Sequence, residues 1–209
     1  MRVTDDRYAG EQARFALALR LIGHQARTHI IMRCTGFSQD RIRKLYGTYF
    51  RDTPGPSVKR RRGKSPSSIE FYVRNPWVQA EASLLVHIFA AWSLLRIQPD
   101  LGLEGVSLPD HLDFGQRFCD AYEEFLAFNP DTAISFEHAW GLLAALTERD
   151  DLLMLDCADC SSFYVQDALA LDRRACPACR TSPRRYRPEA RPARPAARNA
   201  PASGRGGVE

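Results

Sequence analysis

The sequence predicts an all-α helical body, followed by a small module built around four cysteines and then by a disordered basic tail. Three observations carry this prediction. Apolar residues recur at helical spacing through the first 150 residues, and four of the six cysteines lie in one short stretch near the end of the chain. The last residues are rich in Arg, Pro, Ala and Gly. The expected boundaries are 1–150 for the body, 151–182 for the module and 183–209 for the tail.

Five segments of the body show the three-and-four spacing of apolar side chains that is typical of helices, rather than the alternation of strands. They are residues 12–22, 40–49, 77–96, 110–128 and 135–149. Local signals agree with these segments. Pro76 can occupy the first turn of a helix, Ser107 and Asp110 have the spacing of a capping box, and Asn129-Pro130 breaks the chain between two helices.

Residues 26–49 have the pattern of a helix-turn-helix. Gly36 can adopt the left-handed conformation of a sharp turn, and Ser38 can cap the second helix. That helix would bury Ile42, Leu45 and Tyr46 and expose a polar, basic face suited to the major groove. The residues expected on this face as base contacts are Gln39, Arg41, Arg43 and Lys44. An ordinary α-hairpin with Gly in its turn shows the same pattern, so both interpretations stay open.

Two further segments are strongly basic. Residues 51–74 are rich in Pro, Gly and Ser, which predicts a loop. Clustered cations repel one another unless an anion is near, so four residues of this loop are expected to contact phosphate: Lys59, Arg60, Arg61 and Arg62. Residues 180–209 hold eight Arg and two Glu, a net charge of +6, which leaves residues 1–179 at −2 within the total of +4. The tail is expected to be disordered, and it either binds an anion or is a solvated surface.

The chain shows no targeting or spanning signal. Charges are scattered through its first residues, where a signal peptide would have an apolar core. No stretch approaches the ~18 apolar residues that a membrane helix needs. We therefore expect a cytoplasmic protein that does not enter a membrane. The five histidines lie at no spacing typical of metal ligands or of a catalytic triad, so we do not expect an enzyme.

The four late cysteines follow the pattern C-x2-C-x15-C-x2-C: Cys157, Cys160, Cys176 and Cys179. Two such pairs can complete the tetrahedron of a four-thiolate zinc site, in which no position stays open for a substrate. We therefore expect one structural Zn²⁺ per chain, held in a ribbon or knuckle. Two redox centres are a less favoured interpretation, because no βαβ pattern surrounds these cysteine pairs. Disulfides are disfavoured in the cytosol. Arg173 and Arg174, between the pairs, and Arg180, after the second pair, are further expected phosphate contacts.

Residues 12–182 resemble the FlhC family of bacterial flagellar transcriptional regulators. The likeness rests on FSQDRIRKLYGTYFRDTPGP (37–56), RNPWVQAEASLLVHIFAAWSLL (74–95) and HAWGLLAALTERDDLLMLDCADCSSFYV (138–165) with the following CPACR. The resemblance implies an all-α protein with a C-terminal zinc site, whose four ligands match the four late cysteines one for one. It also implies a complex of two such subunits with four FlhD-like subunits. That complex would bind promoter duplex DNA of flagellar operons and activate RNA polymerase.

The chain departs from this family in three places. It carries Glu70-Phe71-Tyr72 where members have Asp-Trp-Phe, its loop is more basic, and its Arg/Pro tail is long. Two other functions remain open, an RNA-binding zinc-ribbon protein and a scaffold that binds a partner but no DNA. Trp77 and Phe89 are candidates for a partner surface, with burial in the core as the favoured alternative.

Overall fold

The computed structural model describes residues 3–51, 58, 60–61, 63, 68–107, 110–148, 151–171 and 175–181. Within these ranges the chain is mostly helical. The helices are α1 (Val3–Gly23), α2 (Thr28–Thr35), α3 (Gln39–Tyr46), the π-helical turn η1 (Gly47–Arg51), α4 (Glu70–Val73), α5 (Pro76–Ala91), α6 (His111–Phe128), α7 (Phe136–Thr147) and α8 (Pro177–Thr181). The strands are β1 (Leu95–Ile97), β2 (Leu103–Gly105), β3 (Leu152–Asp156) and β4 (Phe163–Asp167).

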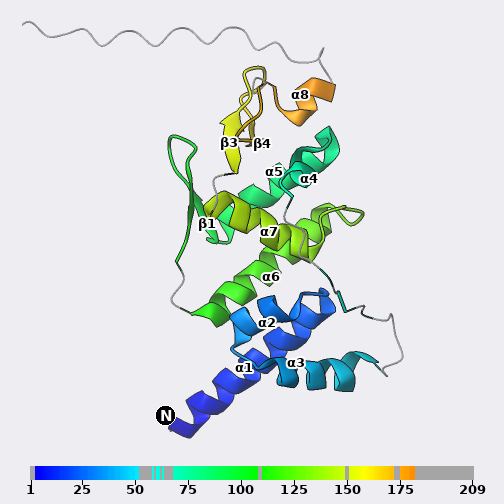
Figure 1. The fold of residues 1–209 in the computed structure, drawn as a ribbon. Helices are drawn as coiled ribbons and strands as arrows, with labels where there is room; N and C mark the ends of the chain where they lie inside the picture. Colours follow the sequence, from blue (N-terminus) through cyan, green and yellow to red (C-terminus); the bar gives the residue numbers. More distant parts are fainter. Residues whose placement is uncertain are drawn as a thin grey trace, which may run out of the picture.

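Figure 1 shows three levels in this arrangement. Helices α1, α2 and α3 form one end, α6 and α7 lie in the middle, and β3, β4 and α8 form the opposite end above α5. The expected tail, 183–209, lies outside the described residues. Among the helices that the structure describes, none combines the length and the apolar character needed to cross a bilayer.

Helices α2 and α3 are joined by the turn that the sequence predicts, which fits both a helix-turn-helix and an ordinary α-hairpin. Gly36 ends α2 with φ 70° and ψ 8°, and its backbone N–H donates to the Met32 carbonyl. Ser38 caps α3 by accepting a hydrogen bond from the Arg41 backbone N–H. The turn is thus three residues long, and only a residue that tolerates positive φ fits its first position.

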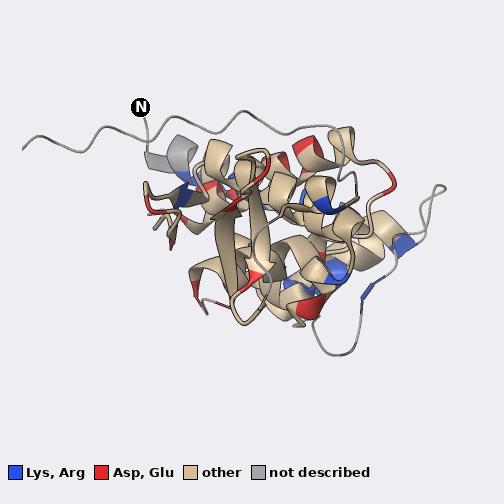
Figure 2. Ribbon diagram, turned by 90° about the horizontal axis from the view of Figure 1, so that it is seen from above, with Lys and Arg blue, Asp and Glu red and all other residues tan. Residues whose placement is uncertain are grey.

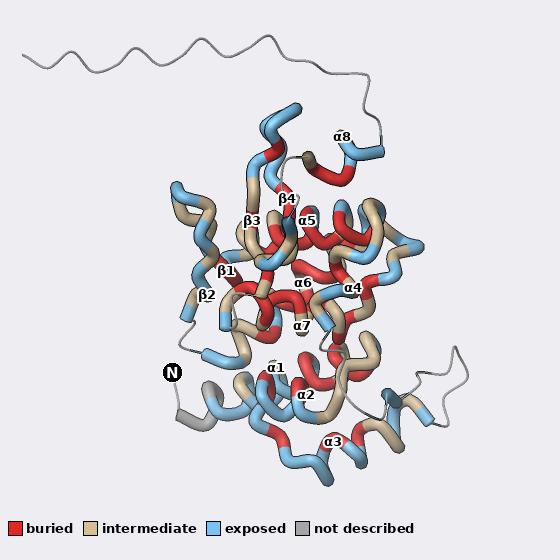
Figure 3. The backbone as a smooth tube through the Cα atoms, turned by 45° about the horizontal axis from the view of Figure 1, so that its top comes forward, coloured by how far each residue is buried: buried red, intermediate tan, exposed pale blue. Residues whose placement is uncertain are grey.

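A single apolar core joins α1 and α2 to α5, α6 and α7. Figure 3 shows its buried residues running through the centre of the molecule from α2 to β4. Gly115 of α6 sets the distance between helices, because a Cβ there would lie 2.8 Å from both Cys34 Cβ and Leu17 Cδ2. Cys34 and Cys119 are buried free thiols in this core, and burial raises the pKa of each to about 12. They serve as small apolar residues.

The expectation of a purely α-helical body is wrong in one place. The helix predicted over 77–96 ends at Ala91, and the chain turns at Ser93, which has φ 56°. Strand β1 then pairs antiparallel with β2, and Leu95 is buried in it. The apolar pattern continued through Leu95 because the strand is buried too, so periodicity alone did not show the end of the helix.

Two other local predictions are corrected. The capping residue of α6 is Asp110, which accepts from the Leu112 backbone N–H, so the expected capping box with Ser107 does not form that cap. The loop predicted over 51–74 contains the short helix α4, whose Tyr72 is buried and donates from its hydroxyl to the His138 carbonyl.

Candidate metal centre

Four sulfur atoms converge at the end of the molecule formed by β3, β4 and α8. They belong to Cys157, Cys160, Cys176 and Cys179, and all lie within 4.8 Å of one another. The Sγ atoms of Cys160 and Cys176 are 3.6 Å apart, far beyond the ~2.05 Å of a disulfide bond. All four thiols are free. The cluster is therefore a candidate metal site rather than a pair of disulfides.

The local backbone explains why these sulfurs meet. The first pair lies in the turn between β3 and β4, which is closed by hydrogen bonds from Cys157 N to the Ser162 carbonyl (2.9 Å) and from Ser161 N to the Cys157 carbonyl (2.8 Å). The second pair lies at the start of α8. Backbone N–H groups there point at sulfur: Cys176 N is 3.2 Å from Cys157 Sγ, and Cys179 N is 3.4 Å from Cys176 Sγ.

The electrostatics of the cluster favour a bound cation. The Ser162 hydroxyl, 3.3 Å from Cys160 Sγ, lowers the pKa of that thiol to about 6. Burial raises the pKa of Cys176, and desolvation together with the neighbouring sulfurs raises the pKa of Cys179. Four thiolates cannot share such a small volume unless a positive charge offsets their repulsion.

The donor set and its size fit a tetrahedral ion with sulfur ligands. A zinc ion with Zn–S bonds of about 2.3 Å places its sulfurs about 3.8 Å apart. The observed separation of 3.6 Å between two of the sulfurs, and the 4.8 Å limit for all of them, match that size. The four cysteines predicted as ligands therefore lie close enough together to hold one metal ion. Which metal they bind belongs to the proposal below.

The cysteine module is joined to the body by hydrogen bonds from two polar side chains of α5, Gln79 and Ser83. The Gln79 side-chain amide donates to the Val165 carbonyl of β4 at 2.7 Å and accepts from Arg180 of α8. Ser83 Oγ accepts from the Val165 backbone N–H at 3.0 Å and donates to the Gln79 carbonyl. Both residues are buried. Side chains of α5 therefore satisfy the backbone N–H and C=O of Val165, as a neighbouring strand would.

The residues predicted to read DNA bases are all exposed on α3: Gln39, Arg41, Arg43 and Lys44. Two of them are also engaged within the chain. The Arg41 guanidinium pairs with Glu11 and lies 3.8 Å above the Phe37 ring, and Arg43 is 3.1 Å from the Asp40 carboxylate. Such exposed pairs are weak and can exchange for contacts with another anion.

The basic loop is anchored beside this helix pair. Arg60 donates to the Thr28 hydroxyl at 3.0 Å, Arg27 donates to the Gly63 carbonyl, and Tyr46 of α3 donates to the Val58 carbonyl. Arg60 and Arg61 are exposed there. Arg180, also predicted to contact phosphate, instead donates to Gln79 of α5. The remaining predicted phosphate contacts, Lys59, Arg62, Arg173 and Arg174, lie outside the described residues.

Charge elsewhere does not gather on one side. Figure 2 shows basic and acidic segments interspersed around the body. Among the described residues, α3 presents Arg41, Arg43 and Lys44 on its exposed face, which suits a polyanion, while Arg61 of the loop lines a separate hollow with His24 and Tyr122.

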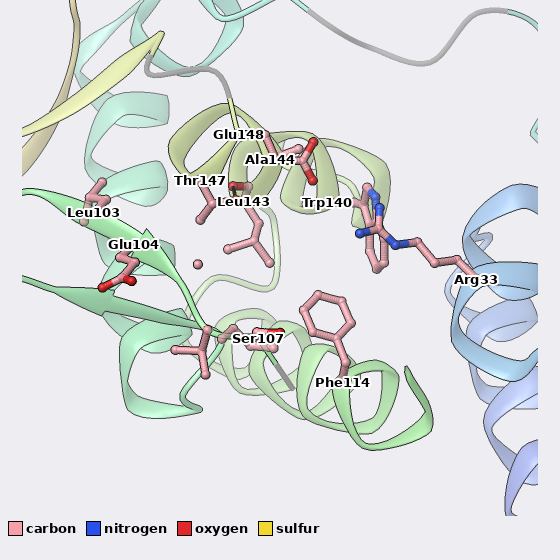
Figure 4. A pocket seen from close by; sticks show the side chains of 13 residues that line it. Arg33, Leu103, Glu104, Ser107, Phe114, Trp140, Leu143, Ala144, Thr147 and Glu148 are labelled. Carbon is pink, nitrogen blue, oxygen red and sulfur yellow. Dashed lines mark hydrogen bonds between the residues drawn. The ribbon is translucent and has the colours of Figure 1, made fainter. Parts of the chain in front are cut away.

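A separate hollow of about 420 Å³ lies between the β1–β2 hairpin, α6 and α7. Figure 4 shows Arg33 reaching across it from α2, and its guanidinium lies 5.7 Å from the centre of the Trp140 ring. Its described lining contains neither His nor Cys, so it offers no imidazole or thiol for catalysis.

The sequence interpretation missed Gln79 and Ser83. The signal was present, because Gln79 and Ser83 lie four residues apart in an apolar-rich helix, among residues whose spacing places them on the buried side, where a polar side chain needs a partner. Comparison with known proteins adds no relative, because no family model matches the chain and no curated protein matches it.

Proposed function

We propose that this chain is a DNA-binding subunit of a transcriptional activator, with one structural zinc ion. The observation that carries the proposal is the helix-turn-helix of α2 and α3, with a polar, basic α3 and basic residues of the following loop held against it. An α-helix with such a face fits the major groove, and neighbouring cations can bind the flanking phosphates.

The metal would have a structural role. Cys157, Cys160, Cys176 and Cys179 would hold zinc with all four positions filled, so the ion supplies no catalytic water. It would tie the start of α8 to the hairpin turn. Among the described residues, the buried cluster around the sulfurs consists of Cys157, Tyr164 and Cys176, and such a small cluster needs a cross-link.

The likeness to FlhC supports the wider part of the proposal. In this reading the chain is a cytoplasmic, non-enzymatic protein that binds promoter duplex DNA together with an FlhD-like subunit, in the ratio of two to four. The complex would activate RNA polymerase at flagellar operons. The end of the molecule that carries α3 in Figure 1 would then bind DNA, and other surfaces would bind the partner subunits.

A gel shift tests this function directly. The chain is purified alone and with an FlhD-like protein, and each sample is titrated onto a flagellar promoter fragment with duplex and RNA competitors. We expect the complex to bind the promoter and duplex DNA to compete better than RNA. Full affinity of the chain alone, or better competition by RNA, would contradict the proposal.

The basic loop has its own test. Replacing Lys59, Arg60, Arg61 and Arg62 by Ala should weaken binding and reduce the slope of log K against log salt by up to about 3.6, because each lost phosphate contact removes about 0.9. The control replaces Arg117 by Ala, a partly exposed cation on α6 that pairs with Asp113. A salt slope equal to that of the control would show that the loop does not contact DNA.

A further inference from the structure

The outer side of α5 carries an uncovered apolar stripe. Its five residues follow one another at intervals of three, four, three and four: Trp77, Ala80, Leu84, His87 and Ala91. Trp77 is 78% exposed and Leu84 is 36% exposed, and four of the five residues are apolar, the exception being His87. An interval of three and four is the heptad spacing by which one α-helix packs along another.

Ala80, Leu84 and His87 of this stripe line one side of a groove of about 440 Å³, and residues of the cysteine module line the other side. Phe163 of β4 and Pro177 of α8 face α5 across it. The Phe163 ring is 46% exposed and lies 6.4 Å from the His87 ring, edge to face. Cys176, one of the candidate metal ligands, also lines the groove, so the geometry of this wall depends on the metal site.

The charges at the rim indicate which kind of helix fits. Asp156 pairs in register with Phe163 across the hairpin, so its side chain lies on the same face as that ring. Asp159 lies in the turn before Ser162, which lines the groove. Both carboxylates are exposed, and neither has an ion pair with a cation in the described part of the chain.

We propose that this groove binds an amphipathic α-helix of a partner protein, with apolar residues at heptad spacing and Lys or Arg beside them. The heptad spacing of the stripe fits a partner helix, and the apolar walls of the groove would bury the apolar side of that helix. The two carboxylates would attract basic residues that flank this side. The inference rests on the proposed function in one respect, since it assigns the surface through which the chain joins its partner.

The test uses a probe that involves neither DNA nor an FlhD-like protein. The probe is a fluorescent 21-residue helical peptide with Leu at both core positions of each heptad and Lys beside them, used below its self-association concentration. Fluorescence anisotropy measures its affinity for the zinc-loaded full chain. Leu84→Asp should weaken binding by about 30-fold, the ~2 kcal/mol of an interface hot spot.

A matched control and a charge exchange make the test specific. Phe128→Asp changes a more exposed apolar residue at the end of α6, 65% exposed, and should alter affinity less than about twofold. Replacing Asp156 and Asp159 by Lys should reverse the preference, so that a peptide with Glu in place of Lys binds better. Far-UV circular dichroism confirms that each variant is folded, and Trp77→Glu repeats the test at a more exposed residue.

Three outcomes would overturn the inference. They are no peptide binding to the unchanged chain, equal binding by the Leu84 and Phe128 variants, and a chain dimer that Leu84→Asp converts to monomer, since a second copy would then occupy the groove. A failed gel shift with normal peptide binding would refute the proposed function and leave the groove standing.

Discussion

Gln79 is the side chain on which the attachment of the cysteine module most depends, and its replacement by Ala is the sharpest stability test. The residue is 0% exposed. Its amide donates to the Val165 carbonyl at 2.7 Å and accepts from Arg180, and it also contacts Gln166 Oε1 at 3.3 Å. Truncation removes these bonds and leaves the Val165 carbonyl buried without its side-chain donor.

The magnitude follows from those contacts. A hydrogen bond contributes about 0.5–1.5 kcal/mol net, and a buried group left unsatisfied costs about 1–3 kcal/mol. We therefore expect Gln79→Ala to lower the free energy of unfolding by about 2–4 kcal/mol. Amides of β4 should exchange with solvent faster, because the hairpin loses its attachment to α5.

Guanidinium titration of the zinc-loaded protein measures the first effect, and hydrogen exchange resolved to peptides measures the second. Gln98→Ala is the control, because Gln98 also donates from its side chain, at 2.8 Å to Glu104, but at the surface. It should cost less than about 0.5 kcal/mol. Equal effects of the two substitutions on the free energy of unfolding, with unchanged hydrogen exchange in β4, would refute the claim that Gln79 attaches the hairpin to α5.

Three further predictions concern the metal, the packing and the pH dependence. Cys176→Ser should abolish zinc binding and expose the β3–β4 hairpin to protease while α1–α3 stay folded, as limited proteolysis would show. Gly115→Ala should destabilise the protein by about 1–2 kcal/mol in chemical denaturation, because the new methyl group meets Cys34 and the gain in helix propensity offsets only part of that overlap. Arg20 hydrogen-bonds Glu123 and lowers the pKa of that carboxyl from 4.5 to about 2. Since the folded pKa is the lower one, this stabilisation is complete above pH 4.5 and is lost as pH falls toward 2, and Glu123→Gln should flatten the stability profile over that range.

Much of the fold followed from local rules in the sequence. The turn at Gly36, the cap at Ser38 and the helix at Pro76 depend on residues close together in the chain, and all three are in the structure. The cysteine spacing likewise placed two pairs of sulfurs at one point, because each pair is held by its own tight backbone turn. Predictions of this kind require no knowledge of long-range contacts.

Features that depend on distant contacts could not be read in the same way. Phe89, considered for a partner surface, is fully buried, whereas Trp77 on the same helix is 78% exposed. Both are aromatic residues in one apolar helix, and only the positions of β4 and α6 decide which side is covered. Strand β1 escaped notice for a related reason, since Leu95 is buried equally well by a strand or a helix.

The central claim is that four thiolates grip one ion and thereby keep the end of the molecule folded against α5. Metal analysis of freshly purified protein, combined with a count of reactive thiols, tests it most directly. We expect one zinc per chain, and four thiols that react only after chelation. Protein that is folded and free of metal, with those four thiols reactive at once or oxidised in pairs, would contradict the claim.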